Sequence, residues 1–269
     1  MFMRTWRLRH RALALLVIQI AAFWPVWQWY VLRATDASSE SWELLALATA
    51  ALFVFLCREE AAPKRIPLGL PIFLLLIYAA SYAFLPPLLR AALAMSALAA
   101  TCSAIWFGRR LHLALWSLLL LSLPVIASLN FYRGYPLRVG AGVGTAALLQ
   151  MNGLAVIREG TLLNWDGQLI AIDAPCSGVK MLWAGLYLCF TLAAFQRQDG
   201  RSMALLGMLT VVAIVLSNIL RATALFYVET GLVALPKQWH AGIGVVVFLV
   251  TALAIASAAH YVKKPTYAT

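Results

Sequence analysis

Charged residues are scarce in this chain, and acidic residues are the scarcest. Asp, Glu, Lys and Arg make up 12% of the 269 residues, with 10 acidic against 21 basic, whereas hydrophobic residues make up 63%. Soluble domains carry about 25% charged and about 45–50% apolar residues, so this composition excludes an ordinary water-soluble globule. Apolar runs of about 20 residues, enough to cross a bilayer, recur along the sequence. The chain is therefore predicted to be an integral membrane protein.

Several patterns that would indicate other functions are missing. The basic residues form no compact patch, so the net charge of +11 does not indicate nucleic-acid binding. The sequence contains no carboxylate pair at ligand spacing, which argues against a zinc site. Gly140, Gly142 and Gly144 follow no predicted strand and precede no P-loop lysine, which favours helix packing over nucleotide binding. We therefore predict no metal and no cofactor.

The apolar runs predict an all-α membrane protein with about eight transmembrane helices. The predicted spans are residues 13–32, 42–57, 66–85, 88–107, 111–129, 177–195, 203–221 and 241–262. The whole of 1–269 is predicted to form a single polytopic domain, with two N-terminal helices in 1–60, an extracytoplasmic insertion in 130–175 and the candidate catalytic helices in 176–262.

The distribution of basic residues predicts the orientation. With eight spans and a cytoplasmic N-terminus, 13 of the 21 Lys and Arg lie inside, and several of the other eight fall in the long outer loop. Both termini are therefore predicted to be cytoplasmic. The basic, apolar N-terminal stretch has no clean cleavage site, so we interpret it as an uncleaved first helix.

The insertion at 130–175 is predicted to hold a small helix followed by a β-ribbon. Residues from about Leu137 to Met151 suit an interfacial helix that Gly153 ends. Short strands are predicted at 154–159, 161–165 and 168–173, with Asp166-Gly167 as the hairpin turn. The ribbon leads into Cys176, just before the sixth span.

Three reactive residues are predicted to lie at the same membrane level. Cys176 is the one cysteine of four placed at the outer surface, and His240 is the one outer histidine of four. Arg221 ends the seventh span, whose 19 residues cover about 28 Å and so bring its guanidinium to the outer interface. A helix N-terminus and Lys180 lower the pKa of the Cys176 thiol, while Asp173 and apolar surroundings raise it.

A nucleophile, a base and a fixed cation are a complete set for acyl transfer. Cys176 would attack a peptide carbonyl, His240 would carry the proton, and Arg221 would stabilise the oxyanion or hold the substrate. Asn218, one turn before Arg221, could orient it. Each residue alone also has a structural interpretation: a buried thiol, a hydrogen-bonded histidine, and an arginine that extends to lipid head groups.

Three sequence blocks resemble the signatures of the exosortase/archaeosortase family of membrane transpeptidases. They are Ala174-Pro175-Cys176-Ser177-Gly178-Val179-Lys180, then Asn218-Ile219-Leu220-Arg221, then Trp239-His240 with Gly244. The resemblance covers about residues 66–262. It implies that Cys176 is the nucleophile and that Arg221 and His240 are essential, with Asn218, Ser177, Gly178 and Lys180 in support. Ala222 and Lys180 depart from the expected pattern, which leaves the subtype open.

The resemblance also implies a function and a location. The expected enzyme cleaves C-terminal sorting signals, made of a short motif, a membrane helix and a basic tail, from exported proteins at the outer face of the inner membrane. It would transfer them to a lipid- or glycan-linked acceptor. The expected partners are these exported proteins and membrane lipids. Two alternatives stay open: a transporter or lipid-binding protein that uses Arg221 for an anionic head group, and a non-catalytic scaffold of exopolysaccharide export.

Overall fold

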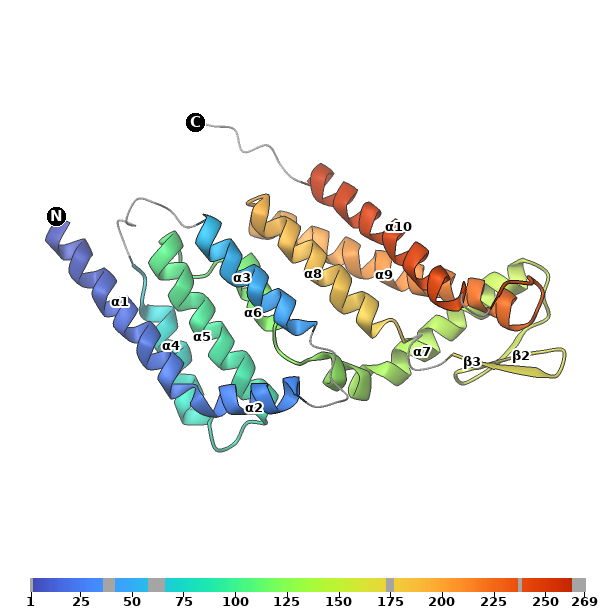
Figure 1. Ribbon diagram of the computed structural model, residues 1–269, viewed down its shortest axis with the longest axis horizontal. Coiled ribbons are helices and arrows are strands. Elements are labelled where there is room, and N and C mark those ends of the chain that lie inside the picture. Colours follow the sequence, from blue (N-terminus) through green and yellow to red (C-terminus); the bar gives the residue numbers. More distant parts are fainter. Residues whose placement is uncertain (1, 36–41, 58–65, 173–176, 237–238, 263–269) are drawn as a thin grey trace. The chain divides into compact units, whose positions relative to one another are not determined.

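The computed structural model describes residues 2–35, 42–57, 66–172, 177–236 and 239–262, and it is mostly helical (Figure 1). Helix accounts for 77% of the structure, together with a small three-stranded sheet. The chain divides into two compact units, Met1–Val125 with Ala193–Arg197 and Ile126–Leu192 with Gln198–Thr269. The prediction of a predominantly helical membrane fold with a short β-ribbon is confirmed.

The first unit is organised around one alanine-rich helix. Its helices are α1 (Phe2–Ala22), α2 (Trp24–Ala34), α3 (Glu43–Cys57), α4 (Gly69–Ser81), α5 (Pro87–Phe107) and α6 (Leu113–Leu121). Helix α5 packs against α1, α2, α4 and α6, and its small residues Ala91, Ala94 and Ala97 are fully buried. Small side chains let helices approach closely in an apolar environment. The Thr101 hydroxyl donates a 2.8 Å hydrogen bond to Gln19 Oε1 of α1.

The first predicted span is not one straight helix. Within residues 10–33 the chain bends by 54° at the break between α1 and α2. Pro25 stands in the first turn of α2. Because proline has no N–H to donate to the preceding turn, it cannot continue α1 and instead begins a new helix.

The second unit contains four helices, and three of them, α8, α9 and α10, carry residues of the motif blocks. They are α7 (Ile126–Met151), most of α8 (Val179–Phe195), α9 (Gly200–Glu229) and α10 (Trp239–Val262). Helix α9 packs against both α7 and α10. It begins with a side-chain cap, because Asp199 accepts a 3.0 Å hydrogen bond from the Ser202 N–H.

The predicted boundary between span 111–129 and an outer helix at 137–151 is wrong. Helix α6 ends at Leu121, and α7 runs without interruption from Ile126 to Met151. The cause is Pro124, which restricts the residue before it and separates the two helices. Pro136 lies inside α7 without ending it.

The predicted end of the seventh span at Arg221 is also wrong. Helix α9 continues to Glu229, and Gly231 follows it with a left-handed φ of +74°. The extra turns are stabilised by burial, since Leu225 and Phe226 pack with Val156 and Leu163 of the insertion. Arg221 therefore lies inside a longer helix rather than at its tip.

The β-ribbon is an antiparallel sheet in the order β1-β2-β3, where β1 is Ile157–Glu159, β2 is Leu162–Trp165 and β3 is Gln168–Ala171. The predicted turn is confirmed, because Asp166 and Gly167 both have positive φ, +50° and +77°. Gly153 ends α7 as predicted, with φ +85°. Leu163 and Ile172 are buried beneath the ribbon against α7 and α9.

Three helices are long and apolar enough to cross a membrane: α5, α9 and residues 241–262 of α10. The bent pairs α1–α2 and α6–α7 raise this number to five if each pair forms one span. Helices α3, α4 and α8 are apolar but shorter, at 10–17 residues. Length and composition therefore support three to five spans among the described residues.

Candidate active site

The structure describes the predicted site residues unequally. Cys176 lies outside the described residues. His240 is the second residue of α10, but its side chain is outside the described part of the chain. Ser177, Gly178, Lys180, Asn218 and Arg221 are described, and Gly178 contacts Asn218 of α9.

Arg221 lies against the backbone of α10. A Cβ atom added to Gly244 would stand 3.2 Å from Arg221 Nε and 3.5 Å from both Cζ and Nη2. Arg221 Nε itself is fully buried. The guanidinium thus occupies the space that a side chain at position 244 would fill, so a larger residue there would crowd Arg221.

Position 240 lies one helical turn before Gly244 on α10. Residues four apart on a helix share a face, so position 240 stands on the face of α10 that meets Arg221. The second and third motif blocks, about 20 residues apart in sequence, are therefore adjacent in the fold. The antiparallel packing of α9 and α10 brings them together.

The start of α8 packs against Asn218. Gly178 has a left-handed φ of +77°, and a Cβ atom there would stand 3.0 Å from Asn218 Cγ and 3.1 Å from Nδ2. Asn218 is 6% exposed. Only glycine combines this backbone conformation with so close an approach. The first motif block therefore lies on α9 one turn before Arg221, and α9 joins all three blocks.

Ser177 and Lys180 have different surroundings. Ser177 is buried, and its hydroxyl donates to Asn130 Oδ1 of α7 over a long distance of 3.4 Å. Lys180 is exposed in the first turn of α8, between the buried residues Val179 and Met181. The Lys180 cation therefore lies on the exposed surface of α8.

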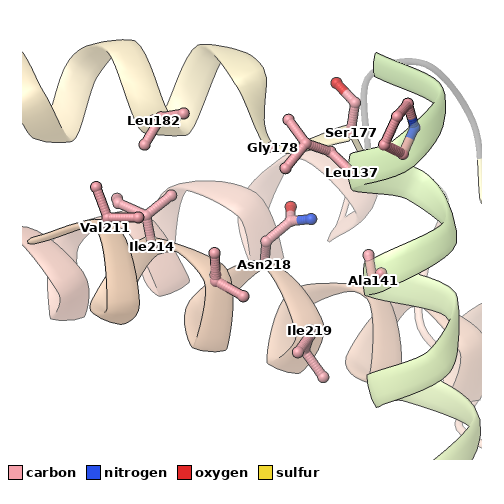
Figure 2. A pocket seen from close by; sticks show the side chains of 12 residues that line it. Leu137, Ala141, Ser177, Gly178, Leu182, Val211, Ile214, Asn218 and Ile219 are labelled. Carbon is pink, nitrogen blue, oxygen red and sulfur yellow. The ribbon is translucent and has the colours of Figure 1, made fainter. Parts of the chain in front are cut away.

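A cleft opens between α7, α8 and α9 beside these residues (Figure 2). Its empty volume is about 560 Å³, part of it open to the surroundings. Asn218 points from α9 toward Ser177 and Gly178, which form its polar end. Its walls are otherwise apolar and include Leu137, Leu182 and Ile214. Such a cleft can hold an apolar chain next to a polar reaction centre.

Two features of this site are absent from the sequence prediction. Asn130 contacts Ser177. It falls at the predicted start of the outer loop, where polar residues are common and do not indicate a functional site. Gly185 of α8 lets Ile214 of α9 approach, since a Cβ there would stand 2.7 Å from Ile214 Cδ1. Glycine inside an apolar helix is the signal that could have revealed this packing. The predicted packing role of Gly144 is confirmed, because it faces Ile219 in the same way.

Comparison with known proteins shows the family of this chain. The sequence profile of the family described as transmembrane exosortase (Exosortase_EpsH) matches residues 6–257. The chain belongs to the exosortase family. No curated protein matches it, and no solved structure does.

The family match includes every block of the candidate site. It extends from the first residues of α1 into the last turns of α10, and so covers Cys176, the Asn218–Arg221 turn and position 240. This exosortase is thus a membrane protein with several apolar helices, in which three blocks converge on one turn of α9.

Proposed function

We propose that this exosortase is a membrane-embedded cysteine transpeptidase that cleaves the C-terminal sorting signals of exported proteins. Such a signal would consist of a short motif, a membrane helix and a basic tail. The observation that carries the proposal is the placement of Gly178 against Asn218 and of Gly244 against Arg221, on one turn of α9. Membership of the exosortase family supports it.

In the proposed mechanism the Cys176 thiolate attacks the carbonyl carbon of the scissile peptide bond. The carbonyl oxygen becomes an oxyanion, and Arg221 stabilises it or holds the substrate beside it, with Asn218 as a further donor. His240 takes the thiol proton and gives it to the leaving amine, so the C–N bond breaks and a thioester remains. An acceptor nucleophile, or water, then displaces Cys176 and restores the thiol.

The cleft fits the proposed substrate. The released part of the signal is apolar, and the walls formed by Leu137, Leu182 and Ile214 are apolar as well. Burial of apolar surface contributes about 25 cal/mol for each Å² and would supply binding free energy at this place. The polar end at Ser177 and Asn218 would then receive the peptide bond.

We further propose an eight-span topology with both termini in the cytoplasm and the site on the outer face of the inner membrane. Eight crossings would result if the three long helices, the two bent pairs and the three shorter apolar helices each crossed the membrane once. The excess of basic residues on the inner side in this arrangement agrees with the positive-inside rule. The site would then bind the exported partners and a lipid- or glycan-linked acceptor outside the cytoplasm.

A comparison of C-termini across the cell envelope tests the function. Cells that make the wild-type chain are compared with cells that make Cys176→Ala at the same level. A set of exported proteins should keep its C-terminal membrane helix in the variant. Identical C-termini in the two strains would refute the proposed activity, and a stronger defect in Arg221→Ala than in Cys176→Ala would favour lipid binding instead.

A further inference from the structure

The β-ribbon has two edges of different character. The edge strand β1 contains Arg158 and Glu159, and the Arg158 guanidinium donates a 2.7 Å hydrogen bond to the Gly160 carbonyl. The other edge strand, β3, reads Gln168-Leu169-Ile170-Ala171 and contains neither charge nor proline. Natural proteins protect sheet edges with charges, prolines or bulges. Strand β1 is protected in this way, and β3 is not.

The register determines which backbone groups of β3 point outward. The Ile172 N–H donates a 2.9 Å hydrogen bond to the Thr161 carbonyl, so Ile172 bonds inward to β2. Bonding alternates along an antiparallel strand, and therefore Ile170 also bonds inward while Leu169 and Ala171 direct N–H and C=O away from the sheet. In the described part of the chain, no backbone hydrogen bond reaches these two residues from outside.

The free edge is firmly supported and accessible. Ile170 packs on the buried cluster that includes Leu163 and Phe226, which fixes the strand from beneath. Leu169 is 59% exposed on the opposite face. An edge of this kind is an existing template for one more extended strand.

The edge is close to the candidate active site along the sequence. Ser177, at the polar end of the cleft, follows Ala171 by six positions, a distance that the chain spans in at most about 22 Å. A peptide paired with β3 would thus be within a few residues of the site.

We propose that the β3 edge binds the substrate as an added antiparallel strand, through the outward N–H and C=O groups of Leu169 and Ala171. The occupant is an extended peptide segment of the exported protein beside its scissile bond. This inference rests on the proposed function, because a transpeptidase must hold an extended backbone next to its nucleophile. Main-chain pairing would supply affinity that does not depend on the side chains of the segment.

Proline substitution on the two edges provides a matched test. Ala171→Pro removes an outward N–H and places a ring against the incoming strand, yet it breaks no bond to β2. Arg158→Pro removes the corresponding outward N–H on the β1 edge, together with the side-chain hydrogen bond to Gly160. We expect Ala171→Pro to reduce processing of the proteins that accumulate in Cys176→Ala by about tenfold. Arg158→Pro should process them at the wild-type rate.

Photo-cross-linking provides a measurement that does not depend on the folding of a proline variant. Leu169 is replaced by p-benzoylphenylalanine in the Cys176→Ala background, and cross-linked peptides are sequenced. The expected product joins position 169 to the segment that precedes the C-terminal membrane helix of an exported protein. Cross-links to lipid, or to position 169 of a second copy of the chain, would overturn the proposal.

The outcomes distinguish the two proposals. If precursors accumulate in Cys176→Ala but Ala171→Pro processes them as Arg158→Pro does, the edge proposal fails and the proposed function stands. If Cys176→Ala changes no C-terminus, the proposed function fails, and a lack of peptide cross-links at position 169 then refutes the edge proposal as well.

Discussion

Arg221 of α9 rests on Gly244 of α10, where a methyl group would stand 3.2 Å from Nε. This contact joins two motif blocks that are conspicuous in the sequence but lie on different helices. It places the cation on the face of α10 that also contains position 240. The geometry leads to predictions in which glycines, rather than the reactive residues themselves, are changed.

Gly244→Ala should reduce processing while the fold is retained. The added methyl displaces the guanidinium by a few tenths of an ångström, and small misplacements of catalytic groups cost up to about 100-fold in rate. We expect a loss of about tenfold for alanine and a larger loss for Gly244→Val, measured as the rate of precursor processing. Gly207→Ala on α9 is the control, because a Cβ there meets nothing within 4 Å. Equal rates for Gly207→Ala and Gly244→Ala would contradict the placement of Arg221.

Gly178→Ala should impair both stability and processing. Its left-handed backbone costs a non-glycine residue about 1–2 kcal/mol, and the methyl would also collide with Asn218 at 3.0 Å. Gly231→Ala has the same backbone strain, with φ +74°, but open space around the Cβ. Thermal unfolding in detergent should show both variants destabilised, whereas processing should fall only in Gly178→Ala. A normal processing rate for stably inserted Gly178→Ala would show that the contact with Asn218 is not needed.

Asn218→Ala should lower the rate of processing more than the abundance of the protein. Removal of one oxyanion donor costs about 100- to 1,000-fold in known acyl-transfer sites. The side chain is buried at the polar end of the cleft, so its loss acts where the carbonyl would lie. Ser217→Ala is a suitable control, since the neighbouring Ser217 hydroxyl accepts a 2.6 Å hydrogen bond from Thr251 instead. A defect of the same size in both variants would indicate a general packing effect.

Cys176 should react with a membrane-impermeant maleimide in cells whose outer membrane has been made permeable. A chain in which Cys57, Cys102 and Cys189 are replaced by alanine isolates the reaction. Labelling that occurs only after the inner membrane is opened would place Cys176 on the cytoplasmic side and contradict the proposed orientation.

The apolar runs predicted most helices because hydropathy alone determines where a chain can cross a bilayer. Helix α5 agrees with its predicted span to within one residue at its start. The start of α7 and the end of α9 were misplaced. Pro124 separates α7 from α6, and the burial of Phe226 against the ribbon prolongs α9 past Arg221. Tertiary packing of this kind leaves no periodic signal in a single sequence.

The sequence proposes the residues of the candidate site but gives no information on its geometry. Cys176, Arg221 and His240 stand out because reactive groups are rare in apolar sequence. The contacts of Gly178 with Asn218 and of Gly244 with Arg221 depend on how three helices meet, so no spacing reveals them. Asn130 was missed for the same reason, since its contact with Ser177 spans 47 positions of sequence.

Mass spectrometry of the tryptic peptide that contains Cys176 tests the proposed chemistry most directly. During processing, we expect a fraction of this peptide to carry the new C-terminus of an exported protein as a thioester. Hydroxylamine should release the adduct, and Gly244→Ala should lower its amount. Precursor processing that continues in Cys176→Ala, with no hydroxylamine-sensitive adduct on the wild-type chain, would contradict covalent catalysis by this cysteine.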